Sequence, residues 1–114
     1  MLDLAFGTVE LISHIVNLFA HFVWNSALLA ADLITSCKFD VRGETVLELG
    51  AGAGLPGIVA ALEGAQFTVL SDYESPTILA NLKRNVDENI PLTLRNRVAV
   101  EGHIWGETVG SITR

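Results

Sequence analysis

VLELGAGAGLPG, from Val46 to Gly57, decides how this chain folds, because a short apolar run leads directly into closely spaced glycines. Two glycine patterns overlap in it. One is G-x-G-x-x-G, which ends at Gly57 and is typical of dinucleotide-binding loops. The other is E-x-G-x-G-x-G, which begins at Glu48 and continues with alternate glycines, Gly50, Gly52 and Gly54. Glycines in such numbers cost conformational entropy, so a loop that brings backbone close to a ligand is favoured over a plain tight turn.

The segments around this loop alternate between helical and strand patterns. Helices are expected over Asn25 to Ser36, Leu55 to Leu62 and Pro76 to Asn89. Strands are expected over Thr45 to Leu49, Phe67 to Leu70 and Arg97 to Val100. This alternation predicts an α/β fold, with a Rossmann-like parallel sheet and flanking helices. In such a sheet a ligand binds outside the carboxyl ends of the strands, where the glycine loop lies.

The composition limits the classes of function. A chain of 114 residues is one domain at most. Thirteen acidic and seven basic side chains give a net charge of -6, which argues against binding nucleic acid through its phosphates. Cys37 is the only cysteine, so no internal disulfide can form, and an intracellular, cytoplasmic location is expected. Its apolar neighbours predict that Cys37 is a small buried residue.

The first part of the chain is unusually apolar. Leu11 to Ala31 contains no Asp, Glu, Lys or Arg and has roughly the length of a membrane span. Its Ser, His and Asn residues, and the lack of a preceding positive cluster, argue against membrane insertion. We expect an apolar N-terminal helix within residues 1–22, packed on several sides. His14 and His21 are too few to form a metal site, and none is predicted.

The charge of the glycine loop discriminates between two candidate ligands. Asp72 follows the glycines by about 20 residues, where an acid bonds ribose hydroxyls in either ligand. Glu48 would lie near the pyrophosphate of a dinucleotide, and two unit charges about 4 Å apart repel by roughly 4 kcal/mol at an effective dielectric near 20. S-adenosylmethionine instead carries a cationic sulfonium and an ammonium group. The loop therefore favours the methyl donor, with an NAD-binding oxidoreductase domain as the alternative.

Three stretches, VLELGAGAGLPGIVAAL, VLSDYESPTILANLKRNV and VEGHIWGE, resemble the seven-stranded S-adenosylmethionine-dependent methyltransferases. Within them the chain is similar to the lysine and N-terminal protein methyltransferases of the nicotinamide N-methyltransferase-like family, especially the fungal enzymes that act on translation elongation factor 1-alpha. The similarity covers about Phe22 to Glu107. It implies methylation of a lysine or N-terminal amine on a protein substrate, with S-adenosylmethionine as cofactor.

The resemblance also implies which residues bind the donor. Those of the first motif line its methionine half: Glu48, Gly50, Gly52 and Gly54. Asp72 holds the ribose, Trp105 lies against the adenine, and Trp24 contacts the donor. From the residues alone, Trp105 suits stacking because it comes just after a strand, although a place in the core is the alternative. Core packing is an equal alternative for Trp24. No residue is assigned as a catalytic base.

The same resemblance predicts a single, incomplete domain over residues 1–114. Residues 23–107 would be the donor-binding half of a seven-stranded domain, and residues 1–22 differ from the usual N-terminal region of the family. The later strands, which supply the acceptor pocket, would be missing. A catalytically silent fragment or an interaction module is therefore a further alternative. Self-association through the unpaired edge of the strand over Thr45 to Leu49 is also expected.

Overall fold

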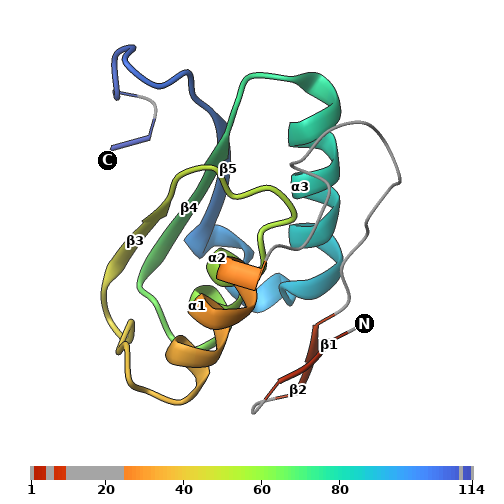
Figure 1. Ribbon diagram of the computed structural model, residues 1–114, viewed down its shortest axis with the longest axis vertical. Coiled ribbons are helices and arrows are strands. Elements are labelled where there is room, and N and C mark those ends of the chain that lie inside the picture. Colours follow the sequence, from red (N-terminus) through yellow and green to blue (C-terminus); the bar gives the residue numbers. More distant parts are fainter. Residues whose placement is uncertain (1, 5–6, 10–24, 111, 114) are drawn as a thin grey trace.

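The computed structural model describes residues 2–4, 7–9, 25–110 and 112–113. Helices and parallel strands alternate along most of this length (Figure 1). The helices are α1 (Asn25–Thr35), α2 (Leu55–Leu62) and α3 (Pro76–Asn89), and the strands between and after them are β3 (Thr45–Glu48), β4 (Phe67–Asp72) and β5 (Val98–Gly102). A short 3-10 helix, η2 (Leu92–Arg97), leads into β5.

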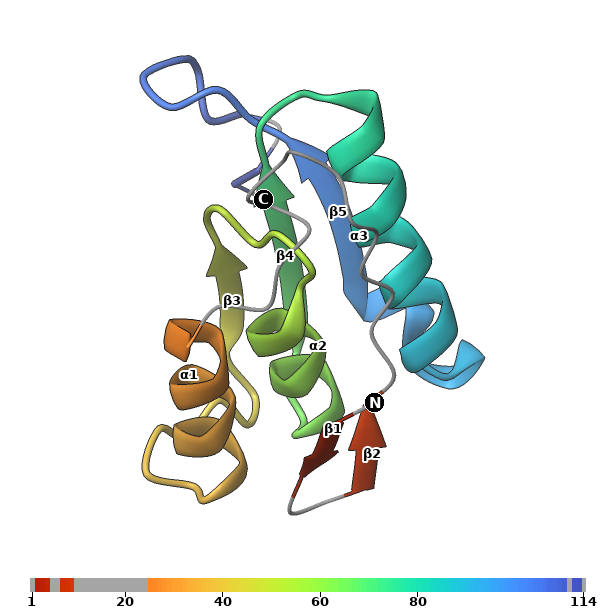
Figure 2. The ribbon, with the colours of Figure 1, turned by 45° about the vertical axis from the view of Figure 1, so that its right-hand side comes forward.

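The central sheet has the strand order β3-β4-β5, and both pairings are parallel. Its register places Glu48 opposite Leu70, and Asp72 opposite Gly102. Figure 2 shows the three arrows pointing the same way, so the glycine loop and the segments after β4 and β5 leave the sheet at one end. The expected α/β fold, a Rossmann-like parallel sheet with flanking helices, is confirmed.

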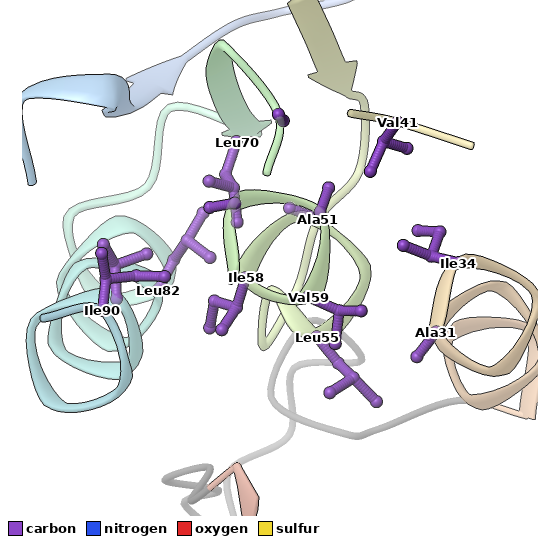
Figure 3. Packing of buried hydrophobic residues seen from close by; sticks show 14 residues of the cluster. Ala31, Ile34, Val41, Ala51, Leu55, Ile58, Val59, Leu70, Leu82 and Ile90 are labelled. Atoms are coloured by element: carbon purple, nitrogen blue, oxygen red, sulfur yellow. The ribbon is translucent and has the colours of Figure 1, made fainter. Parts of the chain in front are cut away.

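One hydrophobic core joins all three helices to one face of the sheet. It contains Ala31 from α1, Ile58 and Val59 from α2, Leu70 from β4 and Leu82 from α3. In Figure 3, α2 lies between α1 and α3, with labelled side chains from each helix. Helices α1 and α3 each bury one apolar face, whereas α2 is apolar on all sides and six of its eight residues are buried.

Strand β3 shows the two-residue alternation of a strand with one face on this core, whereas the central strand β4 is buried on both faces over residues 68–71. Val46 packs against the core, whereas Leu47 is on the opposite face and 42% exposed. Within the described residues β3 pairs only with β4, so β3 forms one edge of the sheet.

The start of the chain differs from the prediction. Leu2–Leu4 and Gly7–Val9 form two antiparallel strands, β1 and β2, with Leu2 opposite Val9. The helix expected within residues 1–22 is therefore wrong for these residues, because Leu-Asp-Leu and Gly-Thr-Val alternate with the period of a strand. The rest of that helix lies outside the described residues. No helix in the described part of the chain is long and apolar enough to span a bilayer.

Two local predictions need correction. Cys37 is exposed rather than buried, because it follows the end of α1 with a positive φ of 60°. Its N–H donates to the carbonyl oxygen of Ile34 at 3.1 Å, which closes the last turn. Strand β4 continues to Asp72 rather than ending at Leu70, and β5 begins at Val98, after η2. The extension of β4 places Asp72 in the last position of the strand.

Candidate functional site

The glycine loop after β3 has a backbone that other residues rarely adopt. Gly50, Gly52 and Gly54 have φ values of 64°, 58° and 88°. A Cβ on Gly54 would lie 2.6 Å from Leu82 Cδ1, and one on Gly57 would lie 2.6 Å from Leu70. These two glycines therefore allow α2 and α3 to pack closely on the sheet. Gly50 is exposed and contributes an open stretch of backbone to the loop.

Hydrogen bonds from β4 and α3 fix the path of this loop. The Ala51 N–H donates to the carbonyl oxygen of Ser71 at 2.9 Å, and the Ser71 hydroxyl donates to the carbonyl oxygen of Glu48 at 2.8 Å. The buried amide of Asn85 donates to the carbonyl oxygen of Ala53 at 3.0 Å. Because the loop is held from two sides, it keeps one conformation, and binding of a ligand does not carry the entropic cost of ordering it.

Asp72 joins the loop to the end of β4. Its Oδ2 accepts the N–H of Gly52 at 2.7 Å, and its Oδ1 accepts the N–H of Tyr73 at 2.7 Å. The side chain is half-buried. A carboxylate has about four lone-pair sites, so each oxygen retains capacity for a further donor. Asp72 can therefore hold the loop and still accept hydroxyl groups from a ligand.

Glu48 is half-buried under the loop, and its carboxylate turns toward the start of α2. Its Oε1 accepts the N–H of Gly57 at 3.0 Å in the first turn of that helix. Because Gly54, the N-cap residue, provides no side chain, Glu48 supplies the missing cap. Burial raises the pKa of Glu48 to about 7; the Gly57 hydrogen bond opposes this rise, and the nearby charge of Asp72 adds to it.

A cavity of about 340 Å³ opens at the carboxyl ends of β4 and β5. It is lined by Asp72, Tyr73, His103, Ile104 and Trp105. Trp105 is 74% exposed, so the alternative in which it belongs to the core is wrong. The cavity brings Asp72 and Trp105 together, although 33 positions separate their numbers in the sequence.

The cavity also adjoins the glycine loop. A Cβ built on Gly50 would be 3.8 Å from Cζ2 of Trp105, which is ordinary van der Waals contact. Three features that were predicted separately, the loop, the acid and the aromatic ring, are thus parts of one site. Trp24 lies outside the described residues. No group of three or more His, Cys, Asp or Glu side chains suited to a metal ion occurs within the described ranges.

Sequence reasoning did not assign Tyr73, His103 and Ile104 to the site. Tyr73 and Ile104 each adjoin a predicted site residue in the sequence, which was the available signal. His103 carries no motif of its own. Its N–H donates to the carbonyl oxygen of Asp72 at 2.8 Å, and this bond continues the pairing of β4 with β5 by one residue.

Comparison with known proteins identifies the family. A model of the lysine methyltransferase family matches residues 8–113. The chain belongs to this lysine methyltransferase family. Protein N-terminal and lysine N-methyltransferase efm7 of Schizosaccharomyces pombe is 40% identical over 96 residues, which is 84% of this chain and 37% of that protein. Its counterpart in Eremothecium gossypii is 42% identical over 101 residues, which is 85% of this chain and 38% of that protein.

Solved structures share the fold of this family member. A Pyrococcus horikoshii protein, PH1948, described as an RNA methyltransferase, has a TM-score of 0.53 and 26% identity over 68% of this chain and 35% of that one. The PRMT1 enzyme-prozyme complex of Trypanosoma brucei with AdoHcy has a TM-score of 0.50 and 26% identity, over 67% of this chain and 21% of that one. The chain spans less than two fifths of the length of these relatives. These likenesses do not favour the dinucleotide alternative.

Proposed function

We propose that this chain binds S-adenosylmethionine and that the reaction it serves is methyl transfer to an amine on a protein. The observation that carries the proposal is the shared cavity of Asp72 and Trp105 beside the glycine loop. Its volume of about 340 Å³ lies within the usual range for small-molecule sites, roughly 300–1,000 Å³. The AdoHcy in the Trypanosoma brucei complex is the demethylated form of this donor and supports the assignment.

The residues present fit each part of the donor. Asp72 would accept the ribose hydroxyls while it retains its hydrogen bond to the Gly52 N–H. Trp105 would present its exposed aromatic face to the adenine. The backbone of Gly50 and Gly52 would border the methionine half. Trp24, implied by the family resemblance, remains a predicted donor contact.

Glu48 would act on the methionine half through charge. Its carboxylate already caps α2, so its contribution to the donor would be electrostatic from beneath the loop. A cationic ligand stabilises the ionised form of this group, whereas a pyrophosphate would meet the carboxylates of both Glu48 and Asp72. When bound, the donor would supply an electrophilic methyl group. This chain's residues would position it, and we assign none of them to proton removal.

The acceptor is proposed from the names of the relatives. Two of them are named protein N-terminal and lysine N-methyltransferases, which favours a primary or N-terminal amine of a protein. Translation elongation factor 1-alpha is the first acceptor to test, because the sequence resembles the fungal enzymes that act on it. A cytoplasmic location and the absence of nucleic-acid binding stay predictions.

Calorimetric titration of the purified chain tests the ligand. We expect S-adenosylhomocysteine to bind and NAD not to bind, because two carboxylates adjoin the loop. Trp105→Ala should weaken this binding, since it removes the aromatic face without touching the hydrogen bonds of the loop. Binding of NAD alone would return the dinucleotide alternative. Binding of neither ligand would favour the alternative of a silent interaction module. The observation that supports this alternative is that β3 pairs on one side only within the described part of the chain.

A further inference from the structure

The carboxylate of Glu48 lies under the glycine loop without a positively charged partner. The side chain is half-buried, and among the described residues its carboxylate accepts one hydrogen bond, from the N–H of Gly57 to Oε1 at 3.0 Å. None of the ion pairs within the described ranges includes Glu48. Removing a carboxylate from water is unfavourable unless other groups compensate its charge. The ionised form of Glu48 therefore lacks a counter-charge in the free chain.

The elements around Glu48 do not supply this counter-charge. Helix α2 contacts it through Gly57 and contains no charged residue. On β4, Asp72 is a second carboxylate, held by the N–H of Gly52 at 2.7 Å. After β5, the titratable His103 lines the cavity and donates its backbone N–H to the carbonyl oxygen of Asp72. Burial, and then the charge of Asp72, raise the pKa of Glu48 to about 7.

The methyl donor and its product differ by one positive charge. In methyl transfer, the lone pair of the acceptor amine forms the new N–C bond, and the electron pair of the S–C bond stays on sulfur. The acceptor nitrogen takes the positive charge and releases a proton to solvent, while the cationic sulfonium becomes a neutral thioether. The ammonium group of the methionine half is common to both ligands. A carboxylate near this half therefore distinguishes them through the charge on sulfur.

We propose that Glu48 makes the site distinguish the methyl donor from the demethylated product by charge, through loss of a proton when the donor binds. The sulfonium would supply the counter-charge that the free chain lacks, so the donor complex favours ionised Glu48. The neutral thioether gives no such compensation, so the product is held less tightly than the donor. The inference rests on the proposed function, since it adds a proton linkage to that same site.

The pH dependence of binding tests this assignment. S-adenosylmethionine and S-adenosylhomocysteine are each titrated into the chain at pH 6 and at pH 8. Over this interval the protonated fraction of Glu48 in the free chain falls from about nine tenths to about one tenth, because its pKa is about 7. The affinity for S-adenosylmethionine should therefore rise by up to about tenfold relative to that for S-adenosylhomocysteine. An equal change for both ligands would overturn the proposal.

Two substitutions show whether Glu48 is responsible for the difference. E48Q keeps an oxygen that can accept the N–H of Gly57 but cannot ionise, so the additional pH dependence of S-adenosylmethionine should disappear. Titration of the ligand's own ammonium group is common to both proteins and cancels in this comparison. As a matched control, E63Q removes a half-buried carboxylate at the other end of α2 and should keep the wild-type dependence. Wild-type behaviour of E48Q would contradict the role of Glu48.

Proton release gives a second readout that needs no variant. Calorimetry at pH 7 in two buffers of different ionisation enthalpy counts the protons released on binding. S-adenosylmethionine should release roughly half a proton more than S-adenosylhomocysteine, because about half of Glu48 is protonated at this pH. The same count for both ligands would contradict the linkage, even if E48Q does not fold.

The outcomes separate this inference from the proposed function. Failure of both ligands to bind the folded wild-type chain would contradict both. Binding of both ligands with the same pH dependence and the same proton count would leave the donor site in place and contradict the discrimination by Glu48 alone.

Discussion

At the scale of single residues, Glu48 couples the charge of the site to the stability of the fold. Its pKa is raised from the usual 4.5 to about 7, mainly by burial. The folded chain therefore keeps a proton that the unfolded chain has released. The stabilisation from Glu48 is complete below about pH 4.5 and is lost as the pH rises to about 7.

This coupling predicts how Glu48→Gln behaves. The amide stays neutral at every pH and its oxygen can still accept the N–H of Gly57. The free energy of unfolding of E48Q minus that of the wild-type chain should be larger at pH 8 than at pH 5. The increase should be on the order of 2 kcal/mol, after allowance for partial solvent exposure. Urea unfolding at both pH values measures it. The same difference between the two proteins at pH 5 and pH 8 would contradict the buried carboxyl.

Asp72 gives a second prediction, this time for binding. Asp72→Ala should weaken the binding of S-adenosylhomocysteine by about 1.5–3 kcal/mol, which is the range for hydrogen bonds to a charged group. It also removes the acceptor of the Gly52 N–H, so Asp72→Asn, which keeps one oxygen, is the matched control. Calorimetry at constant pH compares the three proteins. An unchanged affinity in D72A would remove Asp72 from the site.

Some of these residues were predictable and others were not. Asp72 ends a strand and Trp105 follows one, and the topology of a parallel sheet brings strand ends together, so their place at one end of the sheet was predictable; the cavity that joins them comes from the structure. The Glu48 carboxylate bonding to Gly57 depends on the path of the loop in space, which no spacing rule encodes. His103 looks like any histidine until its burial beside the cavity is known.

At the scale of elements, the glycine loop is a packing device as well as a binding site. Gly54 and Gly43 both have positive φ, 88° and 75°. A Cβ on Gly54 would be 2.6 Å from Leu82, whereas a Cβ on Gly43 would have nothing within 4 Å. Comparing substitutions at Gly43 and Gly54 therefore distinguishes the cost of backbone strain, which both positions share, from the cost of steric contact, which only Gly54 has.

We expect G43A to lower the free energy of unfolding by about 1–2 kcal/mol, from the left-handed backbone alone. G54A should cost roughly 1–3 kcal/mol more, because Leu82 must move in a packed core. Thermal and urea unfolding compare the two variants. Equal costs would mean that α3 does not pack on the loop as described.

Element boundaries were predicted well where local chemistry sets them. The start of α3 at Pro76 follows Ser75, whose hydroxyl accepts the N–H of Ile78. The β1–β2 hairpin was not predicted, because the longer apolar pattern that follows it outweighed two short alternating runs. Such short strands are stabilised by pairing across the hairpin, which a helical periodicity does not detect.

At the scale of the whole molecule, β3 has one face on the core and, among the residues that the structure describes, pairs with no strand on its other side. Leu47 and Leu49 are 42% and 53% exposed beside this edge. Parallel sheets are usually covered on both faces, and an exposed apolar edge favours pairing with another chain. We therefore expect the chain to self-associate at micromolar concentration.

Size-exclusion chromatography with light scattering tests this expectation. L47K should shift the chain toward monomer, because a charge at the edge opposes strand pairing. L92K is the matched control: Leu92 is 91% exposed in η2, which leads into β5 on the opposite side of the sheet from β3, and its replacement should leave association through β3 unchanged. A monodisperse wild-type monomer, or equal effects of the two variants, would contradict association through β3.

The most direct test of the central claim is the NMR spectrum of the backbone amide and indole N–H groups of the ¹⁵N-labelled chain, recorded during titration with S-adenosylhomocysteine. The largest shifts should fall on Gly50, Gly52, Tyr73 and the indole N–H of Trp105, which surround the cavity and the loop. Gly43, whose surroundings are open and which is outside the cavity lining, should stay unchanged. An unperturbed spectrum, or shifts confined to residues away from the cavity, would contradict donor binding at this site.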